Sequence, residues 1–147
     1  MSTVAIAENL ASIKHYGQVD KAGKPYITHP ARVAAAVYFP EAKMVAWLHD
    51  VLEDTDTTAE DLLELGFSAE VVSAVIALTK KPGELRIDAA HRTAKNCLAV
   101  VVKIADVQDN MDLSRLPVIT EKDLKRQEEY KLVMKILQDA LKDFKKK

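Results

Sequence analysis

Apolar residues recur at helical spacing through most of the chain, and short polar or turn-forming stretches interrupt the pattern. Pro30, which suits the first position of a helix, is followed by Val33 and Val37. Thr57 and Glu60 match the spacing of a capping box at the start of another helix. The pattern predicts helices over these segments: Ser2 to His15, about Pro30 through Val37, Pro40 to about Leu52, Thr57 to Leu65, Ser68 to Leu78, about Ile87–Ala94, Cys97 to Leu113, and Thr120 through Leu141 to the C-terminal lysines.

Turn-forming residues are rare, with only 4 Gly and 5 Pro, whereas the strong helix formers Ala, Leu, Lys and Glu are common. The β-branched run Val100–Val102 also suits a buried strand. No turn residue lies between Cys97 and Leu113, however, and a segment of that length favours a helix. We therefore expect an all-α fold, a compact multi-helix bundle, in a single domain that spans residues 1–147.

The composition narrows the class of protein further. The 21 Lys and Arg residues balance 22 Asp and Glu residues, which gives a net charge of −1. The chain therefore has no excess of positive charge of the kind that nucleic-acid-binding domains usually carry. Cys97 has no second cysteine to pair with. No apolar run approaches the roughly 20 residues of a membrane span, and Met1–Leu10 lacks the features of a signal peptide. These features favour a cytoplasmic protein without nucleic-acid or membrane partners, and they leave the oligomeric state open.

One histidine and three acids lie close together between Trp47 and Thr55. His49 lies on or beside the apolar face of its predicted helix, with Glu53 four residues later, and Asp54 follows Asp50 by the same interval. Three carboxylates near the buried side of a helix need a cation or protons to neutralise them. Alternatively, Glu53 and Asp54 begin a solvated loop that needs no cation. This segment alone therefore does not decide between a metal site and a loop.

Two further segments each add a candidate ligand. His29 lies just before a predicted helix start, and Asp106 follows the most apolar stretch of the chain, with Asp109 and Asn110 on the same side of the helix. A lone histidine is more often structural than a ligand, and a buried Asp can pair with an Arg instead of a metal. Together with His49 and Asp50, these residues supply nitrogen and oxygen ligands that suit a divalent transition ion such as Mn²⁺. The chain has no CxxC or HExxH motif, so no thiolate zinc site or zincin site is expected.

The order His29, then His49-Asp50, then Asp106 resembles the H…HD…D signature of the HD-domain phosphohydrolases. More narrowly, the segments Gly23–Pro30, Ala46–Thr55, Leu78–Lys80 and Val102–Asp106 resemble, in order, the hydrolase half of the RelA/SpoT alarmone enzymes. The resemblance covers roughly residues 15–116. Since the chain ends where a synthetase half would begin, it resembles a stand-alone small alarmone hydrolase.

This resemblance implies a reaction and the residues that perform it. The reaction is removal of the 3′-pyrophosphate from guanosine tetra- or pentaphosphate, which leaves GDP or GTP. The implied metal ligands, usually for Mn²⁺, are His29, His49, Asp50 and Asp106. The implied catalytic residues are Glu53 and Asp54, which orient and activate the attacking water, and Asn110, near the metal and substrate. The candidates for binding the phosphorylated nucleotide are Lys21, Lys103, Arg115 and Tyr130.

Two departures from the family pattern leave the nucleotide open. Asp20 stands where an Arg often packs on the guanine base, and Val107 stands where a second Arg is usual. Arg92 or Arg115 are the candidates to compensate. We expect Asp20 to meet the base or the phosphates unless it points to solvent. The alternatives are therefore a hydrolase for another nucleotide or dinucleotide, and a catalytically silent nucleotide-binding module.

Overall fold

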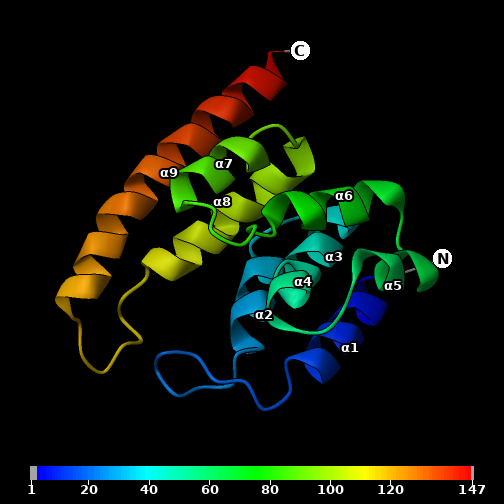
Figure 1. The fold of residues 1–147 in the computed structure, drawn as a ribbon, viewed down its shortest axis with the longest axis horizontal. Helices are drawn as coiled ribbons and strands as arrows, with labels where there is room; N and C mark the ends of the chain where they lie inside the picture. The colour runs from blue at the N-terminus through cyan, green and yellow to red at the C-terminus, as the bar shows by residue number, and fades with distance from the viewer. Residues whose placement is uncertain (1–2, 147) are drawn as a thin grey trace.

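The computed structural model describes residues 3–146, and within that range it contains helices and no strand, which confirms the all-α prediction. Short loops join the helices into one bundle, with the long last helix along one side (Figure 1). The helices are α1 (Val4–Lys14), α2 (Thr28–Ala35), α3 (Pro40–Leu48), α4 (Val51–Asp54), α5 (Ala59–Glu64), α6 (Ala69–Leu78), α7 (Arg86–Thr93), α8 (Cys97–Met111) and α9 (Glu121–Lys145). None of the described helices is long and apolar enough to cross a membrane.

The helix predicted from Pro40 to Leu52 is interrupted, and this part of the prediction is wrong. α3 ends at Leu48, and α4 begins at Val51 after Asp50, whose backbone angles are φ −109° and ψ 0°. Leu48 and Val51 are both fully buried. Apolar spacing therefore continues across the break, and so the sequence pattern carries no sign of it. The break turns His49 and Asp50 out of the regular helix.

The predicted capping box at Thr57 is also wrong, by one residue. Thr58 caps α5 by accepting a hydrogen bond from the Asp61 backbone N–H, and the Asp61 carboxylate accepts one from the Thr58 N–H. The Thr57 hydroxyl is buried instead, and it accepts a hydrogen bond from Thr55. Both threonines fit a cap by residue type, and burial of Thr57 decides between them.

α8 passes between two hydrophobic clusters, which explains its apolar sequence. Val102 and Ala105 pack into the cluster formed mainly by α1, α2, α3 and α6, and Val100 and Val107 pack into the cluster shared with α7 and α9. The run Val100–Val102 is therefore helical and buried on two sides. Because α8 is enclosed in this way, Asp106 is also buried, with an exposed fraction of 4%.

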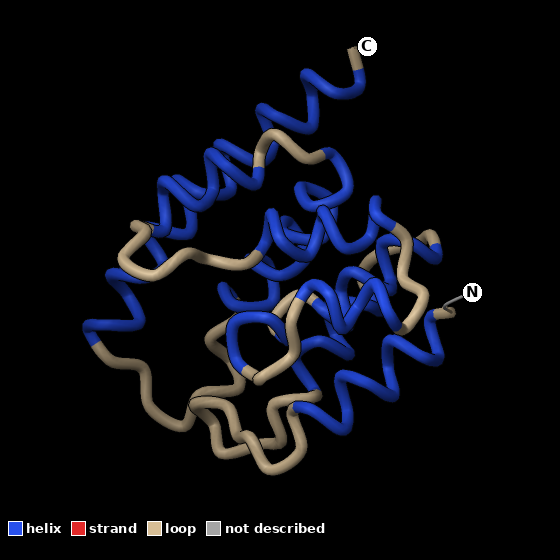
Figure 2. The backbone as a smooth tube through the Cα atoms, turned by 45° about the vertical axis from the view of Figure 1, so that its right-hand side comes forward, coloured by secondary structure: helices blue, strands red, loops and turns tan. Residues whose placement is uncertain are grey.

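Two loops meet at one end of the bundle, the first formed by residues 15–27 and the second by residues 112–120 (Figure 2). A single antiparallel β-bridge joins Val19 to Pro25 in the first loop. Lys21 of this loop lines one shallow pocket together with Leu116, Pro117 and Thr120 of the second. The two loops thus border the cavity described below.

Candidate metal centre

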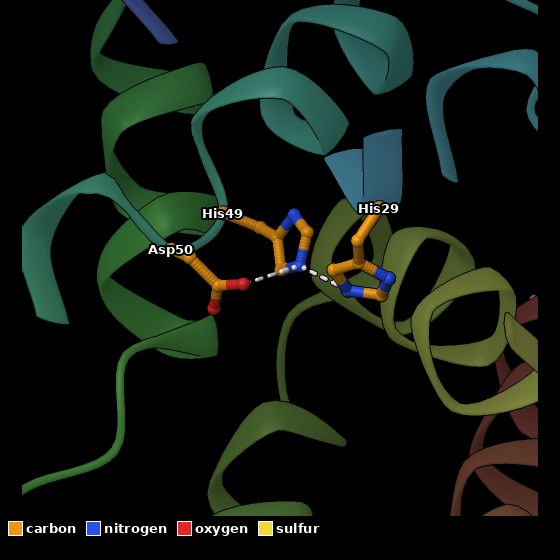
Figure 3. A group of neighbouring side chains, drawn as sticks. All are labelled: His29, His49 and Asp50. Atoms are coloured by element: carbon orange, nitrogen blue, oxygen red, sulfur yellow. Dashed lines mark hydrogen bonds and ion pairs between the residues drawn. The ribbon is translucent and has the colours of Figure 1, made fainter. Parts of the chain in front are cut away.

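The four predicted metal ligands lie together at the meeting point of three parts of the fold. His29 comes from the first turn of α2, His49 and Asp50 from the break between α3 and α4, and Asp106 from α8. Figure 3 shows His29, His49 and Asp50 pointing toward one another. The Nε2 atom of His49 lies 3.3 Å from Nε2 of His29, 3.1 Å from Asp50 Oδ2 and 3.4 Å from Asp106 Oδ1, and His29 Nε2 lies 2.8 Å from Asp106 Oδ1.

The hydrogen bonds of the Nδ1 atoms of His29 and His49, which face away from the cluster, indicate that Nε2 of each ring is the nitrogen available to bind a metal ion. Nδ1 of His49 lies 2.6 Å from the Ala46 carbonyl, which can only accept, so Nδ1 carries the proton of the neutral ring. Nδ1 of His29 likewise faces a carboxylate oxygen of Asp109 at 2.6 Å. Both Nε2 atoms are then free to coordinate, which is the arrangement of histidines that hold a metal.

The ligand atoms of His29, His49 and Asp50 lie within 4.8 Å of one another, which fits a divalent cation, and Asp106 lies beside both imidazoles without belonging to that group. Ligand atoms about 2.1 Å from one ion, at angles of about 90–110°, lie about 3.0–3.4 Å from one another. Three of the four separations, 3.1, 3.3 and 3.4 Å, fall in that range. Two imidazoles and two carboxylates also form the mixed nitrogen and oxygen set that suits transition ions.

The charges in the cluster also favour a cation. Burial alone would lower the pKa of His49, but the carboxylates of Asp50 and Asp106 raise it well above its usual value. Burial would raise the pKa of Asp106, but Lys103 and His49 hold it well below its usual range. The two carboxylates therefore stay ionised and attract positive charge to the point where the imidazoles meet.

Three side chains hold the carboxylate ligands in place. The Tyr26 hydroxyl donates to Asp50 Oδ2. Lys103 Nζ donates to Asp106 Oδ2 at 2.9 Å, and Asn110 Nδ2 donates to Asp106 Oδ1 at 3.2 Å. Sequence reasoning placed Lys103 and Asn110 near the site and missed Tyr26, although Tyr26 precedes His29 by three residues in the same motif.

Asp109 was not assigned a role from the sequence, yet it contacts a predicted ligand directly. Besides His29, it binds the Arg32 guanidinium, whose Nε lies 2.7 Å from Asp109 Oδ1. Burial would raise the pKa of Asp109, but these hydrogen bonds lower it to about 2. Its spacing of three residues after Asp106 was the available signal, because it puts both carboxylates on one side of α8.

The predicted catalytic acids lie at the edge of the cluster. Glu53 and Asp54 form the last turn of α4, and an oxygen from each lies within 4.8 Å of the others and of an Asp50 oxygen. The Glu53 carboxylate accepts a hydrogen bond from the Lys80 backbone N–H at 2.9 Å. Desolvation, and then the neighbouring charge of Asp50, raises the pKa of Asp54. A carboxylate with a raised pKa is better suited to accept a proton from water.

A cavity of about 540 Å³ opens beside the cluster. His29, Asp50 and Asp106 line it, as do Glu53 and Asn110. Its cationic lining residues are Lys21, Arg32, Lys80, Arg86, Lys103, Arg115 and Arg126. A cavity of this size with several cations can hold a polyphosphorylated small molecule next to the cluster.

The other predicted substrate residues all reach this cavity. Lys21 is half exposed, with Nζ 3.7 Å from Asp123 Oδ1. Arg115 is held by Asp112, with Nη1 3.0 Å from Asp112 Oδ2. The Arg86 guanidinium lies over the Tyr130 ring, 5.0 Å from its centroid. Tyr130 thus offers an aromatic surface inside a cationic cavity.

The departures from the family pattern have structural explanations. Oδ1 of Asp20 accepts hydrogen bonds from the backbone N–H groups of Ala22 and Lys24, both at 2.9 Å. Val107 is fully buried in the hydrophobic cluster with α9. Arg92 is not among the cavity residues, because its guanidinium binds Glu84 and the Thr79 carbonyl. The structure therefore excludes Arg92 as the compensating residue, while Arg115 does line the cavity.

No family model matches the chain. A guanosine-3′,5′-bis(diphosphate) 3′-pyrophosphohydrolase of Haemophilus influenzae is 38% identical over 116 residues, which cover 69% of this chain and 17% of that protein. The bifunctional (p)ppGpp synthase/hydrolase SpoT of Escherichia coli is 40% identical over 113 residues, which cover 66% of this chain and 16% of that protein. A solved structure described as a metazoan ortholog of SpoT that hydrolyzes ppGpp superimposes with a TM-score of 0.75 and 28% identity, over 94% of this chain and 84% of that one. The chain thus spans only a small part of the curated relatives.

Proposed function

Because the chain is related to the guanosine-3′,5′-bis(diphosphate) 3′-pyrophosphohydrolases of the RelA/SpoT type, we propose that it is a metal-dependent hydrolase of guanosine tetra- and pentaphosphate. Residues 1–147 would act as one HD-type phosphohydrolase domain. The observation that supports this most is the convergence of His29, His49, Asp50 and Asp106 beside a cavity lined by Lys and Arg side chains as well as by acids.

The proposed cofactor is one Mn²⁺ ion held by His29, His49, Asp50 and Asp106. Such an ion neutralises phosphate oxygens and lowers the pKa of water bound to it. Within the protein, Tyr26 fixes the orientation of the Asp50 carboxylate by a hydrogen bond to Oδ2, the oxygen that faces His49, and Lys103 fixes that of Asp106 by a hydrogen bond to Oδ2, the oxygen that faces away from the imidazoles. The ligands are therefore held in position before a cation or substrate arrives.

Glu53 and Asp54 are proposed to take the proton from the attacking water. The water oxygen forms a bond to the phosphorus next to the ribose, and the bond from that phosphorus to the 3′ oxygen breaks. The proton that the carboxylate took from the water is passed on to the 3′ oxygen, which ends as a hydroxyl, and pyrophosphate is released. A carboxylate within reach of the attacking water contributes typically 10²–10⁴-fold to such a rate.

The remaining cavity residues are proposed to bind and orient the nucleotide. Lys21 and Arg115 carry positive charge toward the phosphates, and Lys103 adds charge next to Asp106. Tyr130 offers its ring to the base. Asn110, bonded to Asp106, lies where its amide can reach both the ligand carboxylate and a substrate oxygen.

The test is release of pyrophosphate or of inorganic phosphate, measured separately, by the metal-free protein supplied with Mn²⁺. The substrates are guanosine tetra- and pentaphosphate, their adenine counterparts, nucleoside monophosphates and NADPH. We expect release from the guanosine compounds, and we expect His29→Ala to lose bound metal and activity together. His91→Ala is the control, since His91 is exposed on α7 outside the cluster.

The other outcomes would each contradict the proposal. Turnover of a different nucleotide, with none of the guanosine compounds, would assign the site to another phosphohydrolase reaction. Nucleotide binding without turnover of any substrate would make the chain a silent binding module.

A further inference from the structure

Asp109 lies behind His29 on the side away from the ligand cluster. Its side chain is only 12% exposed, and Oδ2 lies 2.6 Å from His29 Nδ1. The same carboxylate receives two bonds from Arg32, with Nε 2.7 Å from Oδ1 and Nη2 3.1 Å from Oδ2. The Arg115 guanidinium adds a third cationic contact, at 3.4 Å from Oδ1. The nearly buried carboxylate of Asp109 is thus held by three side chains, those of His29, Arg32 and Arg115.

The arrangement consists of two facing pairs on two helices. On α2, His29 and Arg32 are three residues apart, and on α8, Asp106 and Asp109 have the same spacing. Residues three apart lie on one side of a helix. Asp106 therefore faces Nε2 of His29, while Asp109 faces Nδ1 of the same ring and Arg32.

This placement fixes the orientation of the ring. The Asp109 carboxylate can only accept, so it keeps a proton on Nδ1, and Nε2, which faces Asp106 and the cluster, is the nitrogen left to bind an ion. Arg32 donates hydrogen bonds to both oxygens of Asp109, in the bidentate geometry that guanidinium and carboxylate groups favour. Asp109 therefore has little freedom to rotate away from His29.

We propose that Asp109, oriented by Arg32, is a positioning residue that fixes the ring of His29 for binding the metal ion. This inference rests on the metal site of the proposed function. Asp109 touches neither the ion nor the reacting atoms in this scheme, and it acts only through His29.

The first test is calorimetric titration of the metal-free protein with Mn²⁺ alone. Loss of a partner behind a ligating histidine typically weakens metal binding about 10–100-fold, and we expect that loss in Asp109→Ala. Asp109→Asn keeps an oxygen that accepts from Nδ1, so it should recover most of the affinity. Asp88→Ala is the control, because it removes an exposed acid on α7 that lies outside the cavity lining.

The second test is a double-mutant cycle with Arg32. If Arg32 acts through Asp109, Arg32→Ala weakens Mn²⁺ binding in the wild-type background and has little further effect in the Asp109→Ala background. Equal effects in both backgrounds would mean that Arg32 acts separately, and that would overturn its part of the proposal.

The third test observes the ring directly. In protein loaded with diamagnetic Zn²⁺, long-range proton–nitrogen NMR correlations should show His29 protonated at Nδ1 and coordinated through Nε2. Asp109→Ala should lose that single form. Unchanged Mn²⁺ affinity and an unchanged His29 spectrum in Asp109→Ala would overturn the inference and leave Asp109 as a structural ion pair.

These measurements separate the inference from the proposed function, because none of them uses a nucleotide. A wild-type protein that binds Mn²⁺ through Asp109-supported His29 but hydrolyses no guanosine compound would contradict the function alone. A wild-type protein that hydrolyses them, with Asp109→Ala unchanged in metal affinity, would contradict the positioning role alone.

Discussion

The Nε2 atoms of His29 and His49 lie 3.3 Å apart, although α2 and the α3–α4 break supply them separately. Their Nδ1 atoms face acceptors, Asp109 and the Ala46 carbonyl. Without an ion, the carboxylates of Asp50 and Asp106 favour a proton on these Nε2 atoms and raise the pKa of His49 well above its usual value, so a divalent ion takes the place of that positive charge. This relationship makes binding of a divalent ion stabilising to the fold itself.

We therefore expect Mn²⁺ to raise the thermal midpoint of the metal-free protein. A ligand present at 100 times its Kd stabilises the folded state by about 2.7 kcal/mol, which corresponds to about 5–10 °C for a domain of this size. Thermal unfolding followed by circular dichroism measures the shift. His49→Ala should remove it, and a chelator should reverse it in the wild type. An equal shift in His49→Ala would mean that the ion binds elsewhere.

The paired acids should separate metal binding from turnover. Glu53→Gln and Asp54→Asn change side-chain size little but remove a base, so bound metal should stay while the rate falls on the order of 10²-fold. Metal content and initial rates measure the two effects. Because the pKa of Asp54 is raised, the acid side of the pH–rate profile should lie above the usual range of an aspartate, and Asp54→Asn should remove that limb. Wild-type rates in both variants would refute the assignment.

The sequence predicted the helices well because most of them bury one regular apolar stripe. It also proposed His29, His49, Asp50 and Asp106 as a group, since their order resembles a known signature, and the structure brings these side chains close together. The break at His49 and Asp50 was missed because buried Leu48 and Val51 continue the apolar spacing across it.

The supporting contacts that join separate parts of the chain could not be deduced in the same way. Asp109 and Arg32 are 77 positions apart, and only the packing of α2 against α8 brings them together. Tyr26 meets Asp50 across 24 positions. Such pairs have no local spacing rule, so they require the tertiary structure.

Glu84 and Arg92 form an ion pair outside the metal cluster, and this pair should make the free energy of unfolding depend on pH. The hydrogen bonds from Arg92, and then the one from the Lys81 backbone, lower the pKa of Glu84 from 4.5 to about 2. A carboxylate with a lowered folded-state pKa stabilises the fold above pH 4.5, and this contribution disappears as the pH falls toward 2. The difference in free energy of unfolding between wild type and Glu84→Gln should therefore shrink over that window.

Denaturant titrations at several pH values between 2 and 7 measure this difference. Glu8→Gln, an exposed position on α1, is the control for removing a carboxylate. A Glu84→Gln effect that stays constant over the whole range would show that the pair does not couple to protonation.

The last prediction concerns Asp20, which was expected to meet the base or the phosphates unless it points to solvent. Asp20 lines the cavity, and its Oδ1 accepts two backbone hydrogen bonds within the loop, from Ala22 and Lys24. These bonds shape the loop that carries Lys21 to the cavity. Asparagine also offers an acceptor oxygen at this position, whereas alanine does not. Asp20→Asn should therefore behave like the wild type, and Asp20→Ala should raise KM several-fold because Lys21 is less well placed.

The comparison of guanine with adenine substrates decides between loop shaping and recognition of the base. If Asp20 only shapes the loop, Asp20→Ala changes kcat/KM for both nucleotides by the same factor. If its carboxylate instead accepted from the guanine edge, Asp20→Asn would already lower the preference for guanine, because an amide offers a donor where the carboxylate offers only acceptors. A lower guanine preference in Asp20→Asn, with an unchanged KM for the adenine nucleotide, would thus overturn the loop assignment. We expect an unchanged guanine preference in this variant, because the asparagine oxygen can accept both loop hydrogen bonds.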